Sequence, residues 1–139
     1  MSKISITNKI ENLEKVESFI EQFCNDNNLD EYISFDLHLV EDELATNVIN
    51  YAFDDDLEHI IDISIELESG NVKMQIVDDG KEFNILKAKE ANVNLPLEER
   101  PIGGLGIFLV KQKMDFIDYK RIENKNTLIL KKRIESKEK

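Results

Sequence analysis

The stretch Leu37-His-Leu-Val-Glu-Asp-Glu-Leu-Ala-Thr-Asn-Val-Ile-Asn-Tyr-Ala52 decides the fold, because it carries an apolar stripe and a polar stripe side by side. At about 100° per residue, its apolar residues fall within one sector of roughly 80°, which predicts a helix packed on a core. These residues are Leu37, Val40, Leu44, Val48 and Tyr51. Beside them lies a polar sector that is only about 60° wide. It contains Asp36, Glu43, Asn47 and Asn50.

The polar sector has two interpretations. Two asparagines aligned with a carboxylate can form a partly buried hydrogen-bonded network that only supports the packing of the helix. Alternatively they form a site, since the amide oxygen of an asparagine suits Mg²⁺ and a carboxylate one turn away can orient or deprotonate a hydroxyl. This stretch alone leaves both interpretations open.

The composition predicts one globular domain that does not bind nucleic acid. The chain has 139 residues, of which 41% are hydrophobic and 34% are charged. Its formal net charge of −11 argues against a nucleic-acid surface and favours a basic protein partner. No apolar run approaches the ~20 residues of a membrane span, and Met1–Ile6 lacks the apolar segment of a signal peptide. Cys24 is the single cysteine, so no internal disulfide can form, and we expect a cytoplasmic protein.

The first half of the chain reads as strand, two helices and a hairpin. Alternation predicts a short strand over Lys3–Thr7, and helical spacing predicts a helix over 8–28 and the organising helix over 34–53. Apolar alternation over 59–68 and 71–78, across Ser69-Gly70, predicts a β-hairpin.

The second half contains a long stretch without periodic pattern. Residues 79–103 show none, and loops of this length are usually lids or disordered. A third helix is expected from Gly104, followed by a hairpin with strands over 115–121 and 127–134. Residues 135–139 form a charged tail. Segregated helices and antiparallel strands indicate an α+β fold with helices on one face of a sheet.

Two further motifs carry chemistry. Asp78, at the end of a predicted strand, can accept a hydrogen bond from an exocyclic amine, and Gly80 lets a ligand approach the backbone. Asp-Asp-Gly is also a common turn. The run Pro101-Ile-Gly-Gly-Leu-Gly106 opens the third helix, so its backbone N–H groups can hold a phosphate, although glycine-rich helix starts also serve tight packing. Arg100 just before it can reach a terminal phosphate or belong to a solvated charge run.

Taken together, these motifs resemble the GHKL ATPase superfamily, and more narrowly the anti-sigma factor serine/threonine kinases of bacterial partner switching. Glu43-Leu-Ala-Thr-Asn47-Val-Ile-Asn-Tyr-Ala matches the N box, and Val77-Asp-Asp-Gly-Lys-Glu-Phe-Asn matches the G1 box. Gly103-Gly-Leu-Gly-Ile-Phe-Leu-Val-Lys-Gln-Lys-Met-Asp115 matches the G2 box, and Asn126-Thr127-Leu-Ile-Leu matches the final strand. The resemblance implies a single histidine-kinase-like ATPase domain over residues 1–134. Its fold would be a GHKL-type α/β sandwich, with a mixed, mostly antiparallel sheet and helices packed on one face.

The resemblance also implies roles for individual residues. Asn47 would coordinate Mg²⁺, and Glu43 would serve as the general base. Asp78 would receive the adenine amino group, with Gly80 beside it, and Thr127 would support the adenine pocket. The other ATP-binding residues implied are Asn50, Arg100, Gly103, Gly104, Leu105 and Gly106.

Three positions depart from the family pattern, and one of them is Arg100, which lies a few residues further from the G2-box glycines than the resemblance implies for a lid arginine. Tyr51 stands where many relatives carry His or Lys, which puts a phosphate contact from that position in doubt. Glu82 replaces the second glycine of a strict Asp-x-Gly-x-Gly motif, while Phe83 fits the anti-sigma variant.

The function implied is that of an ATP- and Mg²⁺-dependent protein serine kinase acting as an anti-sigma factor. It would phosphorylate a serine of a STAS-type anti-anti-sigma antagonist and sequester a sigma factor, with no direct contact to nucleic acid or membrane. A homodimer is a further expectation. One alternative is a nucleotide-binding module that sequesters a partner without kinase activity. A second is the catalytic domain of a histidine kinase, for which neither His38 nor His59 offers a suitable phosphoacceptor.

Overall fold

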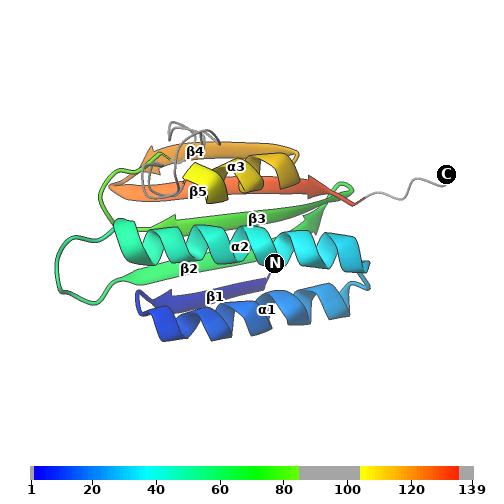
Figure 1. The fold of residues 1–139 in the computed structure, drawn as a ribbon, viewed down its shortest axis with the longest axis horizontal. Helices are drawn as coiled ribbons and strands as arrows, with labels where there is room; N and C mark the ends of the chain where they lie inside the picture. The colour runs from blue at the N-terminus through cyan, green and yellow to red at the C-terminus, as the bar shows by residue number, and fades with distance from the viewer. Residues whose placement is uncertain (1, 85–103, 135–139) are drawn as a thin grey trace.

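The structure is a layer of helices packed on one face of a five-stranded sheet (Figure 1). This computed structural model describes residues 2–84 and 104–134. The strand order is β1-β2-β3-β5-β4, and all four strand pairings are antiparallel. The α+β architecture is therefore confirmed, whereas the mixed character expected of the sheet does not occur among the described strands.

The N-terminal elements follow the expected order with shifted ends. Strand β1 (Ser2–Thr7) is followed by a 3₁₀ turn, η1 (Ile10–Asn12), and then by α1 (Leu13–Asp26). The organising helix α2 (Glu31–Tyr51) begins one turn earlier than the pattern predicts. The reason is the N-cap, since Asp30 Oδ1 accepts a hydrogen bond of 2.9 Å from the Ile33 N–H.

The central hairpin is confirmed. Strands β2 (Ile60–Glu68) and β3 (Asn71–Asp78) pair across a turn in which Ser69 and Gly70 have positive φ angles of 52° and 81°. Alternate side chains of β2 are buried, as the period of two requires.

The second hairpin forms as expected, but its second strand starts earlier than the sequence predicts. Helix α3 (Gly104–Lys113) begins where predicted, and β4 (Phe116–Ile122) and β5 (Lys125–Arg133) follow. The turn consists of two residues with positive φ, Glu123 (51°) and Asn124 (65°), as in a type I′ turn. Strand β5 therefore starts two residues before the expected Thr127.

The core lies between the helices and the sheet. Its buried apolar side chains form one cluster contributed by α1, α2, α3 and the strands. Cys24 of α1 is 4% exposed in this cluster, and burial raises the pKa of its thiol. Asp36 of α2 forms ion pairs with the Nζ atoms of Lys113 of α3 (3.3 Å) and Lys132 of β5 (3.1 Å). These pairs link the first half of α2 to α3 and to the sheet.

Two expectations from the sequence fall on residues that are not described. The proposed lid over 79–103 is described only as far as residue 84, and the charged tail 135–139 lies entirely outside the described residues. Across residues 2–84 and 104–134, no helix combines the length and the apolar character needed to cross a membrane.

Candidate functional site

A pocket opens between the C-terminal half of α2 and the sheet. It contains about 370 Å³ of empty space, including the part open to solvent. Its walls are mostly apolar, with a few polar groups, which is typical of a small-molecule site. The residues that line it are Leu44, Asn47, Val48, Ile76, Asp78, Phe83, Tyr119, Asn126 and Leu128.

Asp78 is the buried acid of this pocket. It ends β3 and is 4% exposed. Its Oδ1 accepts hydrogen bonds from the Gly80 N–H (2.8 Å) and from Asn126 Nδ2 (2.9 Å), while Oδ2 has no partner among the described residues. Burial raises the pKa of Asp78, and the hydrogen bonds from Asn126 and Gly80 oppose that rise. The carboxyl thus presents an acceptor to a ligand with an N–H group.

Asn47 supplies an unpartnered amide to the same pocket. It is 8% exposed, and its Nδ2 has no hydrogen-bond partner within the described part of the chain. Leaving such a group unsatisfied costs about 1–3 kcal/mol. Since the oxygen and nitrogen of an amide are assigned rather than observed, either end can face a ligand.

Glu43 lies one helical turn before Asn47 on the same face of α2. It is half-buried and is not among the residues that line the pocket. Burial, and secondly the charge of Asp42, raise the pKa of Glu43. The direction of this shift is the one that a general base requires.

Gly80 has a structural reason for being glycine. A Cβ at this position would lie 2.4 Å from the carbonyl oxygen of Ala52, which ends α2. The next residue, Lys81, donates its N–H to the same oxygen at 2.9 Å. The glycine thus lets the loop after β3 approach the end of α2, and with it Asp78 approaches Asn47.

The structure does not bring all predicted residues together. Asn50 is exposed and does not line the pocket. Thr127 is buried but pairs with Val77, one residue before Asp78, so its side chain points to the opposite face of the sheet. Arg100 and Gly103 lie outside the described residues, and Gly104, Leu105 and Gly106 form the first turn of α3.

Three polar residues at the pocket were missed from the sequence. Asn126 pairs with Asp78 in the register of β3 and β5, and Tyr119 and Arg121 of β4 both donate to Asn126 Oδ1. The polar run 123–126 suits a turn, so the expected strand begins at Thr127. The alternation of Asn126 with Leu128 and Leu130 was the available signal.

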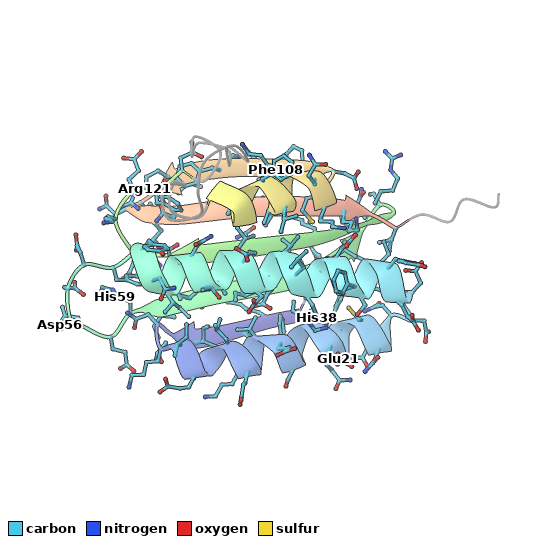
Figure 2. The ribbon with its side chains drawn as sticks, in the orientation of Figure 1. Glu21, His38, Asp56, His59, Phe108 and Arg121 are labelled. Atoms are coloured by element: carbon cyan, nitrogen blue, oxygen red, sulfur yellow. The ribbon has the colours of Figure 1, made fainter. Side chains whose placement is uncertain are left out.

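The loop after α2 is tied to the loop after β3 by His59. Its Nδ1 lies 3.0 Å from Asp79 Oδ1 and its Nε2 lies 2.8 Å from Asp55 Oδ1. The ring stacks on Phe53, with 4.4 Å between centroids. The bond to Asp55 is the largest cause that raises the pKa of His59, and His59 in turn lowers the pKa of Asp55. Figure 2 places His59 and Arg121 at the same end of the sheet.

Comparison with known proteins gives a family and a set of relatives. The family model described as histidine kinase-like ATPase domain matches residues 6–132. The serine-protein kinase RsbW of Bacillus mycoides is 30% identical over 100 residues, which cover 69% of this chain and 62% of the relative. RsbW of Oceanobacillus iheyensis is 30% identical over 84 residues, covering 58% of this chain and 53% of the relative. The chain thus spans less than two thirds of the length of the curated relatives that it matches.

Solved structures share the fold. A crystal structure of the RsbU and RsbW domains of a Mycobacterium tuberculosis protein has a TM-score of 0.65 at 11% identity, covering 96% of this chain and 33% of that chain. The catalytic domain of the histidine kinase ThkA has a TM-score of 0.56 at 15% identity, covering 99% of this chain and all of that chain (100%). The family match over most of the chain, joined to the antiparallel sheet and the pocket beside α2, identifies this chain as a member of the histidine kinase-like ATPase domain family.

Proposed function

We propose that this chain is an ATP- and Mg²⁺-dependent protein serine kinase that acts as an anti-sigma factor. Its substrate would be a serine of a STAS-type anti-anti-sigma antagonist, and its second partner a sigma factor. The observation that carries the proposal is the apolar pocket in which a buried Asp78 and an unpartnered Asn47 face the same space. The names of the RsbW relatives support serine as the phosphoacceptor.

The base end of the nucleotide fits the inner pocket. Leu44, Ile76 and Leu128 supply flat apolar walls, and Asp78 Oδ2 supplies an acceptor for the adenine amino group. A hydrogen bond to a charged acceptor in such surroundings contributes about 1.5–3 kcal/mol. The inner pocket therefore holds the base and fixes its orientation.

The phosphate end fits the outer half of α2. The amide oxygen of Asn47 is chemically suited to a hard cation, so it would hold Mg²⁺. The metal neutralises phosphate charge when it is bound. Backbone N–H groups of the first turn of α3, at Gly104–Gly106, would stabilise phosphate oxygens. Glu43 would orient the serine hydroxyl and take its proton.

Several further features stay predictions from the resemblance. They are the nucleotide contacts of Arg100 and Gly103, a cytoplasmic location and a homodimeric state. The net charge of −11 supports protein partners rather than direct binding to nucleic acid.

A second candidate is a module that binds nucleotide and sequesters a partner without phosphoryl transfer. The position of Glu43 outside the pocket-lining set favours it, because a base must reach the substrate hydroxyl.

Phosphoserine formation on candidate antagonists separates the two candidates. Glu43→Gln keeps the shape of the side chain but loses the base, so it should lower transfer by about 10²–10⁴-fold with ATP affinity nearly intact. Partner binding should survive, because it needs surface rather than proton transfer. Wild-type protein that binds ATP and partner but phosphorylates no antagonist favours the sequestering module. Loss of ATP binding in Glu43→Gln contradicts the catalytic role.

A further inference from the structure

Asn126 is the most heavily hydrogen-bonded side chain at the pocket. Its Oδ1 accepts from Tyr119 Oη (2.6 Å) and Arg121 Nη1 (3.1 Å) of β4. It also accepts from the backbone N–H of Phe83 (3.2 Å). Three donors converge on one oxygen, and the amide is 5% exposed. Turning the amide over would set its NH₂ group against these donors, so its orientation is fixed.

The opposite end of the amide faces the acid. With Oδ1 held by three donors, Asn126 Nδ2 must donate, and it does so to Asp78 Oδ1 (2.9 Å) and to the carbonyl oxygen of Lys81 (2.8 Å). The Gly80 N–H donates to the same Asp78 oxygen. Two donors on Oδ1 hold the carboxyl plane and leave Oδ2 for the pocket. They also favour the ionised form, which accepts hydrogen bonds and donates none.

An acceptor held in this way discriminates between purines. A base with an amino group at its 6-position donates to the carboxylate, whereas a base with a 6-oxo group opposes it with a second acceptor. A site built to hydrogen-bond one group rejects an analogue that lacks it, because the buried partner is then left unpaired.

We propose that Asn126 is the positioning residue that turns one oxygen of Asp78 toward the bound base and so makes the pocket selective for a 6-aminopurine. The inference rests on the proposed function, in which this pocket binds the base of ATP. Asn126 acts through Asp78 and needs no contact with the nucleotide. Tyr119 and Arg121 serve the same end by fixing the amide.

The test compares two nucleotides that differ by one group. ATP and purine-riboside triphosphate, which lacks the 6-amino group, are titrated by calorimetry against wild type and Asn126→Leu. Wild type should bind ATP about ten- to a hundredfold more tightly than the analogue. In Asn126→Leu the affinity for ATP should fall by about tenfold or more, with the analogue changed by less than about twofold. The ratio of the two affinities should therefore collapse.

Two further variants keep the test decisive if Asn126→Leu does not fold. Asn126→Thr retains a hydroxyl that can donate to Asp78 and should restore much of the ratio. Tyr119→Phe removes one of the three donors and should lower the ratio by about threefold or less. Lys120→Ala is the matched control, since Lys120 is exposed on the other face of β4.

The outcomes separate the inference from the proposed function. Equal weakening of both nucleotides in the Asn126 variants means a structural role only and overturns the inference. Full preference for ATP in Asn126→Leu overturns it as well, while adenine binding against Asp78 stands. Wild type without preference for ATP overturns the assignment of the base pocket, and the inference with it.

Discussion

Within the described part of the chain, helix α2 buries polar atoms without hydrogen-bond partners at two places, and one of these places borders the pocket. The pocket-facing amide, Asn47, leaves Nδ2 without a partner among the described residues. Earlier in the helix, His38 and Glu41 form what we call the α1-facing pair, which lies about two turns before Asn47. Glu41 is 2% exposed, and neither its Oε2 nor the two buried ring nitrogens of His38 have a hydrogen-bond partner among residues 2–84 and 104–134.

The surroundings give the two places opposite consequences. His38 Nε2 lies 3.3 Å from Glu21 Oε1 of α1, close enough for an ion pair but not aligned as a hydrogen bond (Figure 2). Burial, and then the charges of Asp42 and Glu17, raise the pKa of Glu41 to about 8. Protonation can therefore offset the free-energy cost of burying Glu41, whereas a bound ligand can offset the cost of burying the Asn47 amide. An unsatisfied buried group marks a ligand site only where there is space for the ligand.

The largest expected effect is on the pH dependence of stability. A pKa raised from 4.5 to about 8 corresponds to about 5 kcal/mol of folding free energy. Because the folded pKa exceeds the unfolded one, this stability is fully present below about pH 4.5 and is lost as pH rises toward about 8. Glu41→Gln should therefore exceed wild type in unfolding free energy at pH 8 and match it near pH 4.5. Urea denaturation across this range measures it.

Glu17→Gln is the control for that experiment. Glu17 is exposed on α1 and contributes only its charge to Glu41, so its removal should have a much smaller effect. Parallel pH curves for wild type and Glu41→Gln would show that Glu41 is not buried as an acid.

The second effect concerns affinity at the pocket. Asp78→Asn turns an acceptor into a group that also donates, so ATP should bind about ten- to a hundredfold more weakly, or 1.5–3 kcal/mol. Calorimetric titration measures the affinity for ATP. The control is Asp118→Asn, a change at a half-buried position of the sheet. Unchanged ATP affinity in Asp78→Asn would show that this pocket does not bind the adenine base.

The smallest effect is on the stability of the free protein when Asn47 is changed. Asn47→Ala deletes an unpartnered amide, so relief of its burial offsets lost packing and the unfolding free energy should change by about 1 kcal/mol or less. Stabilisation by Mg-ATP, measured as a rise in Tm, should be largely lost. A large loss of stability in the free protein, with the Tm rise retained, would make Asn47 a structural residue like its neighbours in the core.

The sequence predicted the central hairpin and most of the apolar face of α2, because both depend on local periodicity, but Tyr51 of that predicted face is exposed. The sequence could not predict the register of β4 and β5, since Glu123-Asn124-Lys125-Asn126 suits a turn of two or four residues and the pairing partners decide between them. That register places Asn126, rather than Thr127, beside Asp78.

Charge interactions between residues far apart in the sequence could not be predicted either. Asp36 shares the polar sector of Glu43 and Asn47, yet its partners Lys113 and Lys132 come from α3 and β5, far along the chain. Nothing in the local pattern distinguishes Glu41 from a solvated glutamate. Its burial follows from the packing of α1, which periodicity does not reveal.

The reactivity of Cys24 can report how often helix α1 separates from the core. It is the single thiol of the chain, it lies buried on α1, and burial keeps it in the unreactive protonated form. A thiol reagent can therefore modify the native protein only when α1 separates from the core, with no second cysteine to confuse the signal. The rate of modification therefore reports how often α1 opens, and no mutation is needed to measure it.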